Sequence, residues 1–112
     1  MSQVVHVGSV EEWKAAIAES RGGKALIVDF TATWCGPCKL MAPIFEKLSI
    51  DFPEVKFLKV DVDELQAVAA ECGVRAMPTF VGFYNGEQVD SVVGADQGKL
   101  RKLVITLATK GK

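Results

Sequence analysis

Two cysteines separated by two residues are the side chains best suited to chemistry in this sequence. Cys35 and Cys38 lie in the segment Trp34-Cys35-Gly36-Pro37-Cys38-Lys39, which follows an apolar run and begins a stretch of helical periodicity. In that context a C-x-x-C pair predicts a redox-active dithiol, because this spacing at the start of a helix brings two thiols within disulfide reach. We expect Cys35 to be exposed on the loop and Cys38 to lie deeper, in the first helical turn.

The start of a helix makes the two sulfurs unequal. Free N–H groups and the positive end of the helix dipole stabilise a thiolate there, so Cys35 is expected to be the nucleophile. Cys38 is then the resolving thiol, which attacks Cys35 in a mixed disulfide and releases the reduced substrate. Pro37 costs no intrahelical hydrogen bond in the first turn, and its fixed φ pre-organises that turn.

A zinc site or a pair of inert buried cysteines would also account for the motif. A structural zinc ion needs four ligands, and only Cys72 and His6 remain, neither of them in a second metal-binding knuckle. We therefore expect no bound metal. Cys72 is expected to be a buried residue at a helix end, with a regulatory or dimer-forming thiol as the alternative. His6 is expected to be a strand residue without catalytic duty.

Hydrophobic patterning predicts the elements that position this motif. The expected strands are a short one over 4–7, then 25–30, 55–61, 79–84 and 88–93. Three of the expected helices begin at the caps Ser9, Asp63 and Asp96, and a long helix runs from Cys35 onward. The apolar stripes of the first two helices are expected to include Val10 and Leu40. Residues 25–61 form a strand-helix-strand unit with a parallel crossover, whereas Asn85-Gly86 predicts an antiparallel hairpin.

Length and composition point to one ordinary globular domain over residues 1–112. The chain has 49% hydrophobic residues and a net charge of -1, from 13 basic and 14 acidic side chains, which favours neither nucleic acid nor a membrane surface as a partner. No stretch approaches the roughly 18 apolar residues of a membrane span, and no leader pattern precedes the first helix. An odd count of three cysteines predicts a reducing compartment, most simply the cytoplasm.

Asp29 is an acidic residue inside the apolar run 25–30. A carboxylate in a central strand is costly to desolvate, so we expect its pKa to be raised. Asp29 is the best candidate to accept and return the proton of Cys38, through a water. The alternative is a structural ion pair between Asp29 and Lys59 on the neighbouring strand, and both roles can coexist.

The sequence resembles the thioredoxin family, and closely the cytosolic eukaryotic members of the plant and algal h-type. The matching residues are Val28-Asp29-Phe30, Trp34 to Lys39, Pro43, Lys59-Val60-Asp61, Met77-Pro78-Thr79 and Gly94, in the family's order and spacing. The resemblance implies an α/β thioredoxin fold, with a five-stranded mixed sheet flanked by four helices. It also implies a monomer without a bound cofactor that reduces disulfides in client proteins. An NADPH- or ferredoxin-dependent thioredoxin reductase would re-reduce it.

The resemblance also implies a surface for binding substrate. It predicts a cis Met77-Pro78 bond beside Cys35, whose backbone pairs with an extended substrate, although most X-Pro bonds are trans. Val93-Gly94-Ala95 resembles the family's second substrate-contacting loop, with a plain strand-to-helix turn as the alternative. Trp34 could belong to the core, but the family likeness favours a surface position next to the thiols. Trp34, Gly36, Pro37 and Lys59 would tune the site.

Two other functions share this scaffold or this motif. Disulfide isomerases and oxidants commonly carry histidine between the cysteines, where it makes the disulfide more oxidising, and Pro37 occupies that place here. The sequence therefore favours a reductant. The remaining alternative is a binding module in which the dithiol has no role.

Overall fold

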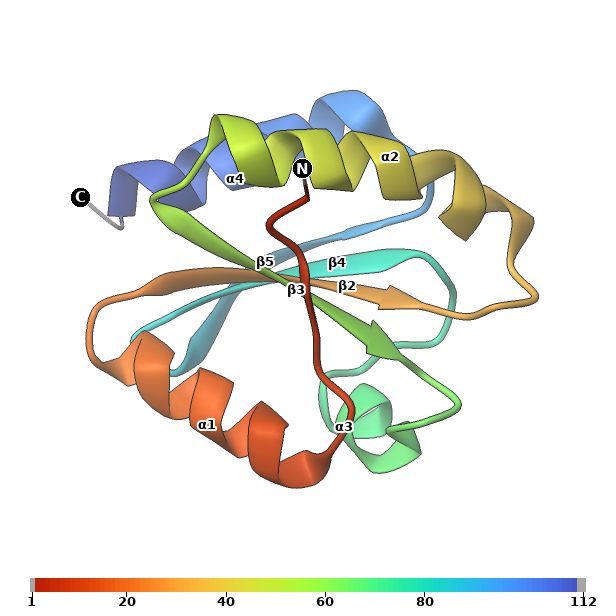
Figure 1. Ribbon diagram of the computed structural model, residues 1–112, viewed down its shortest axis with the longest axis horizontal. Coiled ribbons are helices and arrows are strands. Elements are labelled where there is room, and N and C mark those ends of the chain that lie inside the picture. Colours follow the sequence, from red (N-terminus) through yellow and green to blue (C-terminus); the bar gives the residue numbers. More distant parts are fainter. Residues whose placement is uncertain (1, 111–112) are drawn as a thin grey trace.

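The computed structural model describes residues 2–110, which form a central sheet with helices on both faces (Figure 1). The elements are, in chain order, β1 (Val5–His6), α1 (Val10–Arg21), β2 (Ala25–Thr31), α2 (Gly36–Asp51), β3 (Val55–Asp61), α3 (Gln66–Glu71), β4 (Thr79–Tyr84), β5 (Glu87–Val93) and α4 (Gln97–Lys110). Within these residues no helix combines the length and the apolar character needed to cross a membrane.

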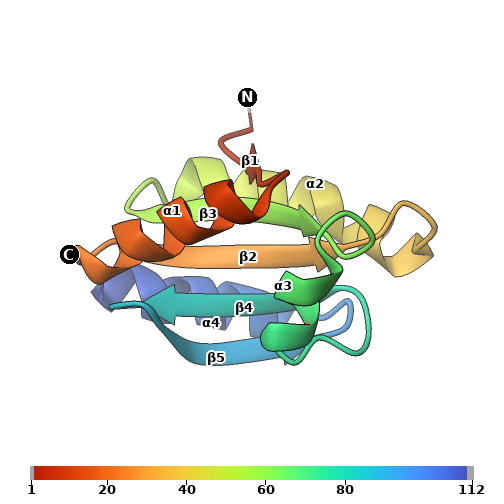
Figure 2. The ribbon, with the colours of Figure 1, turned by 90° about the horizontal axis from the view of Figure 1, so that it is seen from below.

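The sheet has five strands in the order β1-β3-β2-β4-β5 (Figure 2). The strands β1, β3 and β2 run parallel to one another. Strand β4 pairs antiparallel with β2, and β5 pairs antiparallel with β4. Helices α2 and α4 cover one face, and α1 and α3 cover the other (Figure 1). This confirms the predicted five-stranded mixed sheet with four helices.

Each face of the sheet has its own hydrophobic core. Beneath α2 and α4, the rings of Phe45 and Phe57 lie 5.0 Å apart. On the opposite face, Trp13 of α1 packs edge-on against Phe83 at 5.6 Å. The central strand β2 is buried on both faces, as its unbroken apolar run predicts. The buried strand β2 therefore positions the motif that follows it.

Local sequence signals explain where several elements begin or turn. The Ser9 hydroxyl accepts the N–H of Glu12 at 3.1 Å, and the Asp96 carboxylate accepts that of Lys99 at 3.0 Å, so both predicted caps are confirmed. Asn85-Gly86 turns the β4–β5 hairpin with positive φ values of 54° and 79°. A two-residue turn of this kind requires that backbone conformation, which glycine adopts without steric cost.

The third helix begins later than predicted, because Asp63 does not cap it. Helix α3 starts at Gln66, and Asp63 lies in a turn in which its own N–H is donated to Asp61 Oδ1 at 2.8 Å. The predicted stripes also need two corrections, since Val10 and Leu40 are exposed, Leu40 to 70%. Leu40 lies one residue, or about 100° of helical rotation, from the buried Met41, which turns it away from the sheet.

Candidate active site

The C-x-x-C motif lies where the buried strand β2 ends and α2 begins. Cys35 is the N-cap of α2, Gly36 and Pro37 are its first two residues, and Cys38 lies in the first turn. The two cysteines are joined by a disulfide, with their Cα atoms 5.3 Å apart. The predicted pairing is therefore present, and Cys72 is left as a free thiol.

The prediction that Cys35 is exposed and Cys38 deeper is wrong in this disulfide form. Cys35 is only 5% exposed and Cys38 is 3% exposed, because both pack against Ala32 in a small cluster that Met77 partly covers. The two sulfurs differ in their hydrogen bonding rather than in their exposure. The backbone N–H of Cys38 points at Cys35 Sγ at 3.2 Å, so a free N–H of the helix end is directed at this sulfur.

Three segments distant in sequence meet around Cys35. Its Sγ lies 3.6 Å from the carbonyl oxygen of Met77, and the Met77-Pro78 peptide bond is cis, as the family resemblance implied. The N–H of Gly94 donates to the carbonyl of Pro78 at 2.8 Å, which ties the end of β5 to the same loop. Val93 is strongly exposed beside this contact.

Trp34 is an exposed residue held by a partner that sequence reasoning missed. Its indole Nε1–H donates to Asp63 Oδ2 at 3.0 Å, across 29 residues of sequence. Asp63 was expected to cap α3, and that local interpretation left no reason to connect it with the motif. The surface position predicted for Trp34 is confirmed.

Asp29 is buried at a middle position of the sheet. It is 3% exposed, and its Oδ1 has no hydrogen-bond partner among residues 2–110. Desolvation by burial raises the pKa of Asp29 to about 7, while the positive charge of Lys59 acts in the opposite direction. Lys59 pairs in register with Asp29 on β3, yet no ion pair within 4 Å joins their side chains, so the structural ion pair is not formed here.

A cavity of about 400 Å³ connects Asp29 with the motif. Its lining includes Asp29, Lys59 and Cys38, but not Cys35. The cavity has room for water, which can bridge a carboxyl group and a thiol that do not touch. Cys38 is therefore the cysteine with access to Asp29, and Cys35 is the cysteine that faces the Met77 loop.

The third cysteine lies away from this site, at the end of α3. Cys72 is partly buried, and desolvation together with the negative charge of Glu71 raises the pKa of its thiol to about 11. A thiol with so high a pKa is a poor nucleophile at neutral pH. This favours the structural interpretation of Cys72 over the regulatory one.

A protein with a C-x-x-C disulfide at the start of a helix, beside a cis-proline loop and a buried carboxyl group, belongs to the class of thiol-disulfide oxidoreductases. The family within this class follows from comparison of the sequence with known families. The thioredoxin family model matches residues 4–106, and the chain belongs to the thioredoxin family.

Relatives and solved structures agree with this assignment. The chain is 52% identical over 101 residues to an H-type thioredoxin of Picea mariana, covering 89% of this chain and 81% of the relative. It is 50% identical to an H-type thioredoxin of Chlamydomonas reinhardtii over 103 residues, covering 90% and 91%. The crystal structure of the thioredoxin NaTrxh from Nicotiana alata superposes with a TM-score of 0.90, at 43% identity, covering 94% and 92%.

Proposed function

We propose that this protein reduces disulfide bonds in client proteins, with Cys35 and Cys38 as its redox pair. The observation that carries the proposal is the unequal environment of the two sulfurs. Cys35 Sγ receives the N–H of Cys38 at the start of α2, and Cys38 lines the cavity that contains Asp29. The first environment favours a thiolate, and the second provides a base for a thiol.

The reaction then proceeds in two exchanges. The Cys35 thiolate attacks one sulfur of the client disulfide, a mixed disulfide forms, and the other client sulfur leaves as a thiolate that takes a proton from water. Cys38 next gives its proton to Asp29, attacks Cys35 and releases the second client sulfur. The client gains two electrons, and the protein is left with the Cys35-Cys38 disulfide.

The surrounding residues bind the client and adjust the redox pair. Trp34, Met77, Pro78 and the loop Val93-Gly94-Ala95 would contact an extended client segment next to Cys35. Their geometry supports this, because the Met77 carbonyl lies beside Cys35 Sγ and the Gly94 N–H donates a hydrogen bond to the Pro78 carbonyl. The residues that tune the pair would be Gly36 and Pro37 in the first turn of α2 and Lys59, whose charge lowers the pKa of Asp29.

We propose that this protein works in the cytoplasm, where it needs a source of electrons. We propose that the chain acts as one domain and as a monomer, and that a thioredoxin reductase, using NADPH or ferredoxin, regenerates the dithiol. The family membership and the relatives at about 50% identity support this partner. Mixing the protein with NADPH, an NADPH-dependent reductase and insulin tests it. Insulin reduction distinguishes a reductant from an isomerase or a binding module, which would leave the NADPH unused.

The order of attack is tested by trapping. Cys35→Ser removes the nucleophile and should be inert toward disulfides. Cys38→Ser retains the nucleophile but cannot resolve the mixed disulfide, so covalent complexes with insulin should accumulate and dissolve when dithiothreitol is added. Non-reducing gels of both variants give the result, and Cys72→Ser serves as the control for the third thiol. Trapping by Cys35→Ser, or equal trapping by both, would reverse or remove the proposed roles.

A further inference from the structure

Three titratable side chains lie in one row across the parallel half of the sheet. His6 on β1 pairs in register with Lys59 on β3, and Lys59 pairs in register with Asp29 on β2. Residues paired in this way point their side chains to the same face, here the face that α2 covers. From the spacing of neighbouring strands, the two ends of the row are about 10 Å apart.

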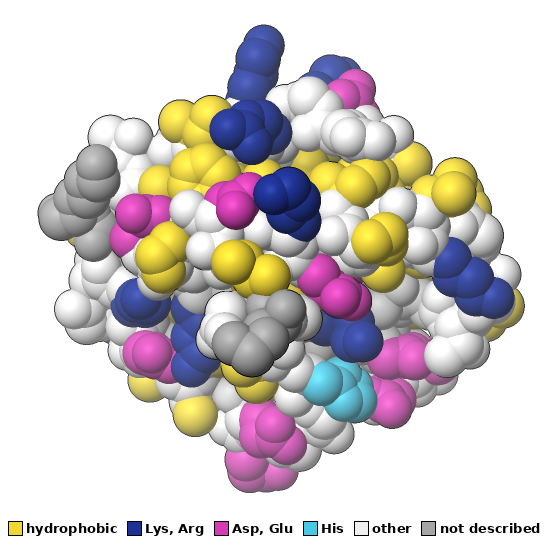
Figure 3. Space-filling model, turned by 45° about the horizontal axis from the view of Figure 1, so that its top comes forward, with side chains coloured by type: hydrophobic (Ala, Val, Ile, Leu, Met, Phe, Trp, Pro, Cys, Tyr) yellow, Lys and Arg dark blue, Asp and Glu magenta, His cyan; other side chains and the backbone are white. Residues whose placement is uncertain are grey.

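The same three residues line the space behind the motif. The cavity of about 400 Å³ that contains Asp29 and Cys38 also contains His6 and Lys59. A smaller adjoining space of about 110 Å³ is lined by His6, Asp29 and Lys59 as well. The row is thus continuous from the buried carboxyl group of Asp29 to the surface, where His6 is half-exposed. Figure 3 shows the histidine, in cyan, at the surface among acidic and basic side chains.

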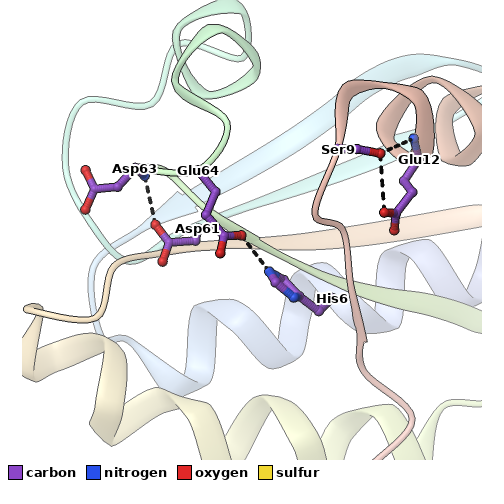
Figure 4. A network of polar contacts seen from close by, with 6 residues as sticks. All are labelled: His6, Ser9, Glu12, Asp61, Asp63 and Glu64. Atoms are coloured by element: carbon purple, nitrogen blue, oxygen red, sulfur yellow. Dashed lines mark hydrogen bonds and ion pairs between the residues drawn. The ribbon is translucent and has the colours of Figure 1, made fainter.

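Glu64 fixes the position of the His6 ring. His6 Nε2 and Glu64 Oε1 are 2.8 Å apart, although the two residues are 58 positions apart in sequence (Figure 4). Glu64 lies in the turn after β3 and also lines the larger cavity. A carboxylate at this distance restricts the orientation of the ring.

The other charged groups around the cavity come from two elements. Helix α2 contributes Lys39 to the larger space and Glu46 to the smaller one, and β3 contributes Asp61 beside Lys59. Among all these groups His6 has the only side-chain type whose ordinary charge changes near neutral pH. A positive charge at His6 therefore alters the field at Asp29.

We propose that His6, held by Glu64, is a positioning residue for Asp29, and that its positive charge at the mouth of the cavity favours the ionised Asp29 that accepts the Cys38 proton. The inference rests on the proposed function, because it assigns to Asp29 the role of base. His6 touches neither sulfur and acts only through the electrostatics of the cavity. Asp29 titrates at about pH 7, so a modest change in its surroundings changes the ionised fraction at neutral pH.

Two opposite substitutions separate charge from structure. His6→Gln retains a polar side chain without the charge, and His6→Lys supplies a permanent positive charge. The midpoint of the pH profile for single-turnover insulin reduction should move up in His6→Gln and down in His6→Lys. Two unit charges about 10 Å apart in a partly hydrated site predict a separation of about 0.5 pH unit between the two variants. The NMR titration of the ¹³C-labelled Asp29 carboxyl group should show the same order.

The neighbouring residue on β1 offers a matched control. Val5 is exposed and pairs with Leu58, whose side chain belongs to the opposite face of the sheet. Val5→Lys adds the same charge to the same strand away from the cavity, and the midpoint should stay at the wild-type value. A shift as large as that of His6→Lys would overturn the proposal, because net charge alone would then explain it.

The reciprocal measurement leaves His6 intact. Because the chain has a single histidine, its ring C–H resonance is an unambiguous reporter. Coupling between two sites is mutual, so the His6 titration in the wild type should carry a second inflection at the Asp29 midpoint. Asp29→Asn should remove this inflection. Identical His6 titrations in the two proteins, or coincident pH profiles of His6→Gln and His6→Lys, would overturn the proposal.

Insulin reduction by the wild-type protein, measured in parallel, tests the proposed function separately from the role of His6. A wild type that reduces insulin while the His6 variants follow its pH profile leaves the proposed function standing and removes only the role of His6. A wild type that reduces no disulfide removes both.

Discussion

The buried carboxyl group of Asp29 has opposite effects on the stability of the fold and on the proposed reaction. Its carboxyl group is buried in the central strand with Oδ1 unpartnered among the described residues, and burial raises its pKa from 3.8 to about 7. The folded protein therefore holds a proton on Asp29 over a pH range in which the unfolded chain has released it. A group with this titration destabilises the folded state once it is ionised, and it provides a base at neutral pH.

We expect Asp29→Asn to be more stable than the wild type, by an amount that depends on pH. Between pH 3.8 and about 7 the folded state binds more protons than the unfolded state, so the wild-type free energy of unfolding falls as the pH rises through this window. The advantage of Asp29→Asn should grow over the same window and level off above it, reaching at most about 4 kcal/mol. Insulin turnover should nevertheless be slower, because the base has been removed.

Urea unfolding on both sides of pH 7 and in mildly acidic buffer measures this difference. Asp90→Asn, which removes an exposed carboxylate from β5, is the control for the loss of one charge. A difference between Asp29→Asn and the wild type that stays constant with pH would contradict the raised pKa. Turnover equal to the wild type from pH 6 to pH 8 would contradict the role of Asp29 as a base.

At the scale of elements, the contact between α4 and β4 depends on a missing side chain. Gly82 lies within β4, and a Cβ atom built on it would come within 2.9 Å of Leu107 Cδ1 and 3.2 Å of Leu103 Cδ1. Both leucines belong to α4 and are buried against the sheet, so they have little room to move away. The absence of a side chain at Gly82 lets the helix pack closely on the sheet.

We expect Gly82→Ala to lower the free energy of unfolding by about 1–3 kcal/mol, the usual cost of overpacking a core. Gly8→Ala is the matched control, because the nearest atom to its added Cβ is 3.8 Å away. This control should change stability by less than about 0.5 kcal/mol. Urea unfolding of both variants is the measurement. Equal effects at the two glycines would show that backbone entropy, rather than packing against α4, dominates.

At the scale of the whole molecule, the surface proposed to bind clients is assembled from segments that are far apart in the chain. Trp34 follows β2, Met77 precedes β4, and Val93 ends β5. The contact of Cys35 Sγ with the Met77 carbonyl and the hydrogen bond from Gly94 N–H to the Pro78 carbonyl join these segments. The surface therefore exists only when the sheet is complete, whereas the two cysteines lie three residues apart in the chain.

Val93→Asp should reduce kcat/KM for insulin roughly tenfold, because it places a charge in an apolar contact. The rate with a small aromatic disulfide, which needs only Cys35, should change much less. Val89→Asp is the matched control, because Val89 is exposed on the same strand near the hairpin, at the end away from Gly94. Equal losses with both substrates, or equal losses in both variants, would argue against a protein-binding role for Val93.

The sequence by itself determined the features that depend on local interactions. The C-x-x-C motif at a helix start, the caps Ser9 and Asp96 and the Asn85-Gly86 hairpin were predicted correctly, because each rests on residues a few positions apart. The burial of β2 also followed from its own composition. The family resemblance added the cis Met77-Pro78 bond, which local reasoning alone disfavours.

Only the tertiary structure decided which distant side chains meet. The hydrogen bond from Trp34 to Asp63 and the contact between His6 and Glu64 join residues 29 and 58 positions apart. Neither could be predicted from pattern, because both depend on the register of parallel strands that a crossover connects and on the path of the turn after β3. The same register placed Asp29 and Cys38 on one cavity, and the closure of the Met77 loop buried Cys35. The sequence thus determined which groups could do chemistry, and packing decided the surroundings in which they do it.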